Sequence, residues 1–260
     1  VGGISPRLEG EEMKVNVEGF KGGDRTSIEL PKAQRDMIAM LKEAGKKVIF
    51  INCSGSAIAL EPESRNCEAI MQAWYGGERG GEAVADILFG DYNPSGKLPI
   101  TFYKNDSQLP DFEDYKMAGR TYRYFKGEPL FKFGHGLSYT TFEFGKPKYN
   151  NKTGKLTVTI ANTGKMDGET VVQIYVRDTQ SKYEVVNTHL AGFARVALKA
   201  GEEKQVAVKL DKNAFTVVND EGERIADGKV FDLYCGLSQP DALSVELTGQ
   251  APIKTTVTFE

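Results

Sequence analysis

Hydrophobic residues in the first hundred positions follow two patterns, helical spacing and short continuous runs. Residues 30–47 predict a helix, with Pro31 near its start and Gly45 at its end. The apolar stripe of this helix consists of Met37, Ile38, Met40 and Leu41. The continuous apolar run at residues 48–54 is typical of a strand that is buried on both faces.

The same two patterns then repeat along the chain. Residues 69–77 predict a second buried strand around Trp74, and residues 80–91 predict a second helix that stops at Gly90. Strands that alternate with helices in this order indicate parallel strands joined by right-handed crossovers. We therefore expect an α/β fold with a mostly parallel sheet, a partial α/β/α sandwich, in the first part of the chain.

After about residue 144 the pattern changes to strict alternation of apolar and polar residues, which indicates half-buried strands. About seven short strands separated by turn signals predict an antiparallel, all-β sandwich. The predicted strand segments are KLTVTIAN, ETVVQIYVRD, HLAGFARVAL, KQVAVKL, FTVVND, VFDLYCGL and LSVELTG.

Two domains are predicted, residues 1–143 and residues 144–260. The first includes a polar, Pro/Gly/Tyr-rich connector at residues 103–143. A connector of this length carries function or wraps another domain. Within it, GRTYRYF (residues 119–125) interleaves arginines with aromatic rings. Such a stripe packs against a neighbouring domain or stacks on sugar or base faces, and packing is the favoured interpretation.

Charge and hydropathy remove several classes of function. The 260-residue chain has 33 basic and 36 acidic residues and a formal net charge of −3, without a basic stripe, so nucleic-acid binding is not supported. No apolar run reaches the roughly 18 residues of a membrane span. No signal peptide is visible, and because Val1 starts inside a predicted strand, we expect the chain to be a fragment.

Metal and cofactor chemistry has little support in the sequence. Cys53, Cys67 and Cys235 have neither the number nor the spacing of a disulfide framework or a zinc site. His135 and His189 are the only histidines, and no motif places them. The segment CSGSAIAL (residues 53–60) lacks the Gly-Lys-Ser/Thr ending and the G-x-G-x-x-G spacing of nucleotide-binding loops. No cofactor and no metal are expected.

A cluster of carboxylates follows the first predicted strand. Glu9, Glu11 and Glu12 lie within four positions, directly after the apolar VGGI. Such clusters are most often solvated surface. In open α/β sheets, however, ligands gather beyond the carboxyl ends of the strands, which makes an acid at this position a candidate for function.

Several motifs in succession resemble the C-terminal part of glycoside hydrolase family 3 enzymes. In order they are EGEE, GGDR, GKKVIFINCSGSAIAL, AIMQAWYGGERGGEAVADILFGDYNPSGKLPITF and FKFGHGLSYTTFEF. The resemblance covers residues 1 to about 144, and the predicted β-sandwich is similar in layout to the fibronectin type III-like domain that commonly ends these enzymes. The EGE…GGDR…LPKAQ pattern is somewhat closer to the β-xylosidase branch than to the β-glucosidase branch.

The resemblance implies a retaining, exo-acting β-glycosidase that hydrolyses terminal non-reducing β-linked sugars. Enzymes of this family usually carry a nucleophilic Asp on an N-terminal (β/α)8 barrel, which this chain lacks, and a general acid/base Glu on a loop of the following domain. The loop pattern matches Glu11 as first choice and Glu9 as the alternative, while Glu12 fits less well. The implied partners are a glycoside or oligosaccharide substrate and the barrel of the same enzyme, in a periplasmic or secreted location.

Two other functions stay open on sequence alone. One is a non-catalytic, carbohydrate-binding or scaffolding fragment that has lost its barrel. The other is a nucleotide-binding α/β domain that uses CSGSAIAL. An upstream barrel with a nucleophilic Asp would argue against the first, and a failed nucleotide titration would argue against the second.

Overall fold

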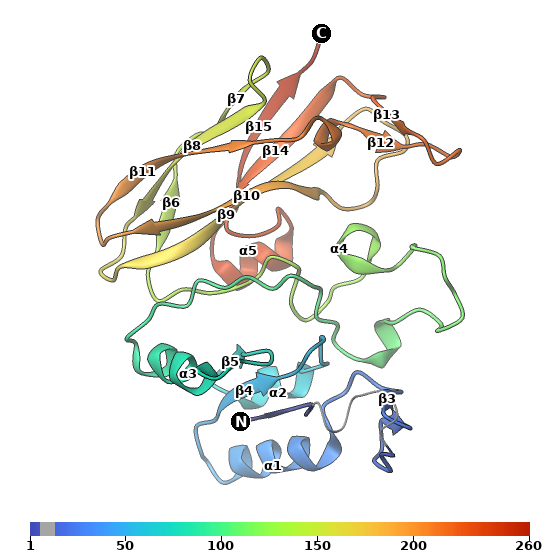
Figure 1. Ribbon diagram of the computed structural model, residues 1–260, viewed down its shortest axis with the longest axis vertical. Helices are drawn as coiled ribbons and strands as arrows, with labels where there is room; N and C mark the ends of the chain where they lie inside the picture. The colour runs from blue at the N-terminus through green and yellow to red at the C-terminus, as the bar shows by residue number, and fades with distance from the viewer. Residues whose placement is uncertain (6–13) are drawn as a thin grey trace. The chain divides into compact units, whose positions relative to one another are not determined.

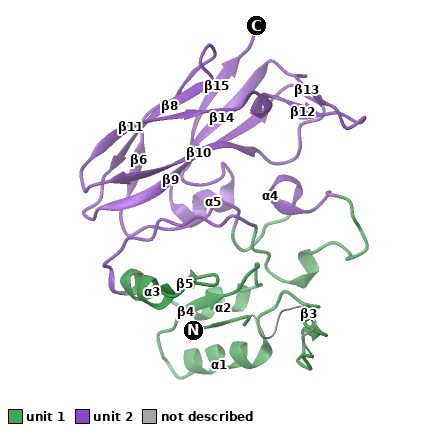
Figure 2. Ribbon diagram, viewed as in Figure 1, with its two compact units in different colours: residues 1–88, 101–116, 127–131 green, residues 89–100, 117–126, 132–260 purple. Residues whose placement is uncertain are grey.

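The computed structural model describes residues 1–5 and 14–260. The chain divides into two compact units (Figures 1 and 2). The first consists of residues 1–88, 101–116 and 127–131, and the second of residues 89–100, 117–126 and 132–260. Among the described residues, no helix has the length and hydropathy of a membrane span.

A three-stranded parallel sheet forms the first unit. Its strands are β1 (Gly2–Gly3), β4 (Ile49–Cys53) and β5 (Ala69–Gln72), in the spatial order β1-β4-β5. Both neighbouring pairs are parallel. The remaining elements of this unit are the short strands β2 (Phe20–Lys21) and β3 (Asp24–Arg25), the helices α1 (Lys32–Glu43), α2 (Glu61–Asn66) and α3 (Gly80–Phe89), and the 3-10 turn η1 (Asp106–Gln108).

The core of the first unit joins the sheet to α1. Ile38 of α1 is buried with Ile4 and Phe50, and the cluster is completed by Leu30, Ile58 and Leu60. An ion-pair network links the same helix to α2, because Arg35 bonds Glu63 at 2.9 Å and Glu29 at 2.8 Å. Burial alone would lower the pKa of Arg35, but its hydrogen bonds to the two glutamates raise that pKa above its ordinary value.

Two antiparallel sheets form the sandwich of the second unit. One has the order β10-β9-β14-β15, and the other has the order β11-β8-β6 with β7 also paired to β8. The bounds are β6 (Phe142–Phe144), β7 (Lys148–Asn150), β8 (Lys155–Asn162), β9 (Gly168–Asp178), β10 (His189–Leu198), β11 (Glu203–Lys209), β14 (Val230–Gly236) and β15 (Ile253–Thr258). The smaller elements are α4 (Thr121–Tyr124), η2 (Lys212–Phe215), β12 (Val217–Val218), β13 (Arg224–Ile225) and α5 (Ala242–Thr248).

Alternate residues of the facing strands fill the sandwich core. Leu156, Ile160, Ile174 and Leu233 are each fully buried between the two sheets. Burial of such side chains supplies about 1.5–3 kcal/mol each, which makes this layer the main source of stability in the unit.

The other face of β9 is also covered. Gln173 donates to the carbonyl of Gly134 at 2.9 Å and to that of Leu237 at 2.6 Å, while Tyr175 is fully buried and donates to Gln173 at 2.6 Å. Phe133 stacks on Tyr122 with ring centroids 4.3 Å apart. The segment from Lys132 onward therefore packs on the sandwich sheet before β6 begins.

The observed topology confirms the predicted fold class, a parallel α/β sheet followed by an antiparallel sandwich. The prediction of a strand at residues 243–249 is wrong, because these residues belong to helix α5 and its C-cap. The strand predicted over residues 69–77 ends at Gln72, since Trp74 has a φ of 56° and cannot continue an extended strand. In the predicted apolar stripe Ile38 is buried, but Met37 and Met40 are 52% and 67% exposed.

Because residues 132–143 pack on β9, a fragment of the sandwich that includes them should be more stable than one that lacks them. A chain of residues 132–260 should unfold cooperatively and should be more stable than a chain of residues 144–260 by about 2–5 kcal/mol. The shorter fragment loses the cover over Tyr175 and the buried Phe142. Urea unfolding of the two fragments, followed by circular dichroism, provides the comparison. Equal free energies of unfolding would show that residues 132–143 do not belong to the sandwich.

Candidate active-site face

The predicted acid/base candidates, Glu11 and Glu9, lie outside the described residues, as does Glu12. The structure does describe the strand that leads into them. Gly2 and Gly3 of β1 pair in parallel with Asn52 and Cys53 of β4. The cluster therefore follows the carboxyl end of a sheet strand in sequence, the position at which open α/β sheets bind ligands.

A glutamine of α1 holds the end of β1. The side chain of Gln34 accepts from the backbone N–H of Gly3 at 2.7 Å and donates to the carbonyl of Gly3 at 2.8 Å. The N–H of Ile4 donates to the carbonyl of Cys53 at 2.9 Å, and the Ile4 side chain is buried. These bonds fix the backbone of Gly3, the last residue of β1, and of Ile4, which follows it.

A tyrosine from the segment after β5 holds the next carbonyl. The Tyr75 hydroxyl donates to the carbonyl of Ile4 at 2.6 Å. The ring of Tyr75 also lies against Gly55, where an added Cβ would come within 2.9 Å of the ring. One side chain thus connects the ends of all three strands, since Gly55 follows β4 and Tyr75 follows β5.

Polar side chains gather at the carboxyl ends of β4 and β5. Asn52 and Ser54 are fully buried, and Asn52 Nδ2 donates to Gln72 Oε1 at 2.5 Å and to Ser54 Oγ at 3.1 Å. Ser54 Oγ donates to the carbonyl of Ser56 at 2.8 Å, which closes the turn after β4. This amide and hydroxyl cluster rigidifies the face of the sheet from which residues 6–13 depart.

The turn in CSGSAIAL serves the sheet and has no features of a phosphate loop. Its Ser56 hydroxyl accepts from Arg25 Nη1 at 2.8 Å, and the N–H of Ala59 donates to the carbonyl of Ile28 at 2.8 Å. The ring of Tyr75 occupies the space that a side chain at Gly55 would need. The nucleotide-binding alternative therefore gains no support from this turn.

In the GRTYRYF segment the structure favours packing. Tyr122 stacks on Phe133, and its hydroxyl accepts from the N–H of Leu190 at 3.1 Å. The side chain of Asn187 donates to the carbonyls of Tyr122 and Phe125, both at 2.8 Å. The Tyr122 ring and the carbonyls of Tyr122 and Phe125 thus already have partners within the protein, so they are not available to stack on or bind a sugar.

Both histidines belong to the second unit. Burial lowers the pKa of His189 to about 4, and His189 Nε2 lies 3.1 Å from the carbonyl of Ala214, to which its N–H donates. Burial, together with the nearby Lys97 ammonium, lowers the pKa of His135 to about 4. Within residues 1–5 and 14–260, no group of three or more His, Cys, Asp or Glu side chains could hold a metal ion.

Sequence reasoning missed Gln34 and Tyr75, the two side chains that hold the β1 end. A glutamine in a helix and a tyrosine after a strand carry no motif. The only available signal was the polar INCS ending of an otherwise apolar strand, which indicates that Asn52 and Ser54 have partners inside the unit.

The fold and this face define a class of modular protein, a parallel α/β unit with a polar strand-end face joined to an antiparallel β-sandwich. The chain belongs to glycosyl hydrolase family 3: residues 1–139 match the model of the Glycosyl hydrolase family 3 C-terminal domain. Residues 170–239 match the model of the Fibronectin type III-like domain.

Curated relatives support the same membership. The chain is 54% identical over 253 residues to a xylan 1,4-beta-xylosidase of Xylanibacter ruminicola, which covers 95% of the chain and 29% of the relative. It is 37% identical over 235 residues to a periplasmic beta-glucosidase of Salmonella typhimurium, covering 84% of the chain and 31% of the relative. The chain thus spans about 30% of the length of these relatives.

A solved structure has the same fold. The beta-glucosidase of Kluyveromyces marxianus matches 92% of the chain and 30% of its own length with a TM-score of 0.79 and 29% sequence identity. The beta-glucosidase of Listeria innocua, solved in complex with gluconolactone, matches 92% of the chain and 34% of its own length with a TM-score of 0.74 and 28% identity.

Removing the two hydrogen bonds between Gln34 and Gly3 should destabilise the chain. Gln34→Ala should lower the free energy of unfolding by about 1–3 kcal/mol, because it leaves a backbone donor and acceptor of Gly3 without partners. The measurement is urea unfolding of the 260-residue chain. Glu43→Ala, an exposed position of the same helix, is the control and should change stability by less than about 0.5 kcal/mol. If both variants behave alike, Gln34 does not hold β1.

The buried His189 predicts a loss of stability in acid. Its folded pKa of about 4 lies below the unfolded value of about 6.5, so the unfolded state binds more protons between these values. Its contribution is fully present above pH ~6.5 and is lost as the pH falls towards ~4. From pH 7 to 5 the chain should lose about 1–2 kcal/mol more than His189→Gln loses, measured by urea unfolding at each pH. Parallel pH profiles for the two proteins would contradict this assignment.

Proposed function

We propose that the chain is the C-terminal portion of a retaining, exo-acting β-glycosidase that removes terminal non-reducing β-linked xylose or glucose. The observation that carries this proposal is the family match over residues 1–139 together with 54% identity to a protein named xylan 1,4-beta-xylosidase. We name both sugars as candidate substrates because the relatives include a protein named as a xylosidase and one named as a glucosidase. The Salmonella relative's name supports a periplasmic or secreted location.

Glu11 is the proposed general acid/base, and Glu9 is the alternative. Support comes from their place in the sequence, a few residues after β1 at the carboxyl end of the sheet. Gln34 and Tyr75 hold the backbone of Gly3 and Ile4, so the chain enters residues 6–13 from a fixed point. The nucleophile is proposed to be an Asp on an N-terminal (β/α)8 barrel of the same enzyme, beyond the residues of this chain.

The chemistry then needs one carboxyl that is protonated and one that is ionised. In the first half-reaction the Asp carboxylate attacks the anomeric carbon while the acid/base Glu gives its proton to the departing glycosidic oxygen. In the second half-reaction the same Glu takes a proton from water, which attacks the glycosyl-enzyme and releases the sugar with retained configuration. An isolated Glu titrates near pH ~4.3. Three neighbouring carboxylates repel one another and raise the pKa of at least one, which favours a usable acid.

Replacing Glu11 by Gln in the full-length enzyme tests the proposed role. Hydrolysis of a natural disaccharide should fall by about 10²- to 10⁴-fold, because its poor leaving group needs the proton. An activated aryl glycoside should still form the covalent intermediate and then stall, since water has no base. Azide needs no base and should restore turnover, giving a glycosyl azide of retained configuration. Product analysis by NMR and steady-state rates with and without azide give the readout.

The matched variant is Glu9→Gln. If Glu9 only tunes the pKa of its neighbour, this variant should shift one limb of the pH profile and show no azide rescue. Rescue of the Glu9 variant alone would transfer the acid/base role to Glu9. Rescue of neither variant would exclude this acidic cluster as the source of the proton and would favour a non-catalytic role for the chain.

A further inference from the structure

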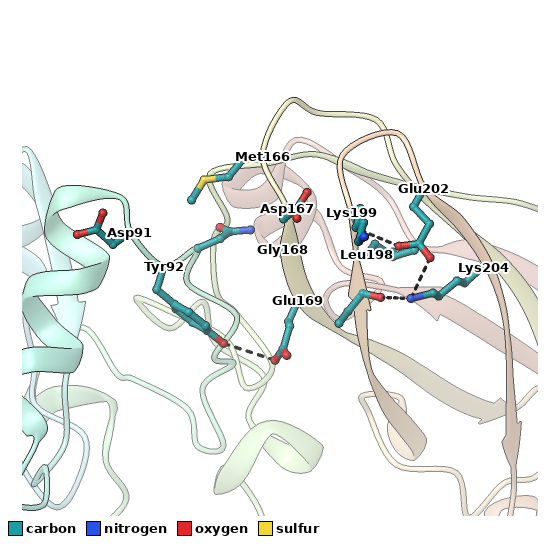
Figure 3. Close-up of a pocket in the computed structure, with 12 residues that line it drawn as sticks. Asp91, Tyr92, Met166, Asp167, Gly168, Glu169, Leu198, Lys199, Glu202 and Lys204 are labelled. Carbon is teal, nitrogen blue, oxygen red and sulfur yellow. Dashed lines mark hydrogen bonds and ion pairs between the residues drawn. The ribbon is translucent and has the colours of Figure 1, made fainter.

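The second unit contains a pocket of about 440 Å³ at one end of the sandwich (Figure 3). Three segments of that unit line it: the residues after α3, the turn that enters β9, and the turn between β10 and β11. All of the lining residues belong to the second unit, so the amide cluster of Asn52, Ser54 and Gln72 is not among them. The volume falls within the range of pockets that bind small ligands, about 300–1,000 Å³.

One wall of the pocket combines an aromatic ring with a carboxylate. Tyr92 is 44% exposed, and its hydroxyl lies 3.4 Å from Glu169 Oε2, to which it donates. Arg195 Nη1 donates to the same oxygen at 2.8 Å and to Ser95 Oγ at 2.9 Å. Figure 3 shows Tyr92 and Glu169 joined on this side. The ring is thus held in place with an exposed surface beside the carboxyl group of Glu169, a hydrogen-bond acceptor.

The other wall is a short network of charged groups. Glu202 accepts from the backbone N–H of Lys199 at 2.7 Å and pairs with Lys204 at 3.1 Å, while Lys204 donates to the carbonyl of Ala197 at 2.7 Å. The hydrogen bond from Lys199 and the contact with Lys204 hold the pKa of Glu202 below its usual value. This side of the pocket therefore contains a carboxylate acceptor, Glu202, and an ammonium donor, Lys204 (Figure 3).

One lining residue, Asn93, is a buried amide that anchors the residues after α3. Asn93 is 4% exposed, and its Oδ1 accepts from Ser138 Oγ at 3.0 Å and from the N–H of Tyr139 at 2.8 Å. Its Nδ2 has no hydrogen-bond partner in the described part of the chain. This nitrogen faces Gly168, where an added Cβ would lie 2.1 Å from it, so only a glycine leaves room there. Gly168 therefore packs directly on the Asn93 amide, which fixes the turn that enters β9 beside the pocket.

The charges and the ring together select the class of ligand. The lining carries four acids (Asp91, Asp167, Glu169 and Glu202) against two lysines (Lys199 and Lys204), a formal balance of −4 + 2 = −2. This balance disfavours phosphates and uronates and favours a neutral molecule rich in hydroxyl donors. The face of Tyr92, together with Met166, suits the C–H face of a sugar ring.

We propose that this pocket is a saccharide-binding site for a neutral β-linked pentose or hexose oligosaccharide, the substrate class on which the proposed function rests. Tyr92 stacks on one ring, Glu169 and Glu202 accept from hydroxyls, and Lys204 donates to a ring or hydroxyl oxygen. The sandwich would thereby hold a sugar chain on the same polypeptide that contributes the acid/base.

The test is a titration of the 260-residue chain with xylotriose and with cellotriose, followed by ¹H–¹⁵N NMR. At least one of the two should bind with a Kd on the order of 1 mM, with shifts at residues 91–93, 166–169 and 197–204. Ala197→Trp fills the pocket from an exposed strand position and should weaken binding at least tenfold. Ala207→Trp, at an exposed position on β11 outside the pocket, is the matched control and should bind as the parent chain does.

Two results would overturn the proposal. One is the absence of shifts with both sugars at tens of millimolar. The other is unchanged binding by Ala197→Trp. Because the titration involves no turnover, it is independent of azide rescue: failed rescue in the Glu11 and Glu9 variants would reject the proposed function, while a failed titration would reject only this saccharide site.

Discussion

The close approach of β1 to β4 is the constraint on which the candidate active-site face depends. At Gly3 an added Cβ would stand 2.0 Å from the carbonyl oxygen of Cys53, and the φ of this residue is 119°, so only glycine permits the pairing. This pairing sets Ile4 in the core and presents its carbonyl to Tyr75. A bulkier residue would separate the strands and move the point from which the acidic segment departs.

The rest of the first unit stabilises that point of departure. Gln34 binds both backbone groups of Gly3, and the Asn52 and Gln72 amides fasten the neighbouring strand ends to each other. A general acid needs its carboxyl within about one hydrogen bond of the glycosidic oxygen, and misplacement by ~1 Å can cost ~10²-fold in rate. Rigid strand ends directly before residues 6–13 in the sequence would therefore serve the chemistry proposed for Glu11.

Local patterns predicted most of the fold, and long-range partners account for what they missed. The segments KLTVTIAN and HLAGFARVAL coincide with β8 and β10, because a sheet with one face in the core imposes its alternation on the sequence. LSVELTG alternates as well, but its two ends carry helix caps. The Asp241 side chain accepts from the N–H of Ser244 at the N-terminus, and Gly249 adopts a left-handed conformation at the C-terminus, so the segment forms a helix. In the candidate site, a family pattern was needed to select Glu11 and Glu9. No local pattern could reveal Tyr75, whose bond to Ile4 spans 71 positions.

The most direct test of the account is the distance between two carboxyl groups in the full-length enzyme. A crystal structure of the glycosyl-enzyme trapped with a slow fluorinated substrate would identify the nucleophile by its covalent bond. We predict an Asp on an N-terminal barrel, with the carboxyl of Glu11, or of Glu9, about 5–5.5 Å from it, as retention requires. If the fluorinated substrate formed no covalent glycosyl-enzyme, a retaining mechanism would be contradicted, and a trapped complex with neither Glu11 nor Glu9 near the bound sugar would contradict the proposed acid/base.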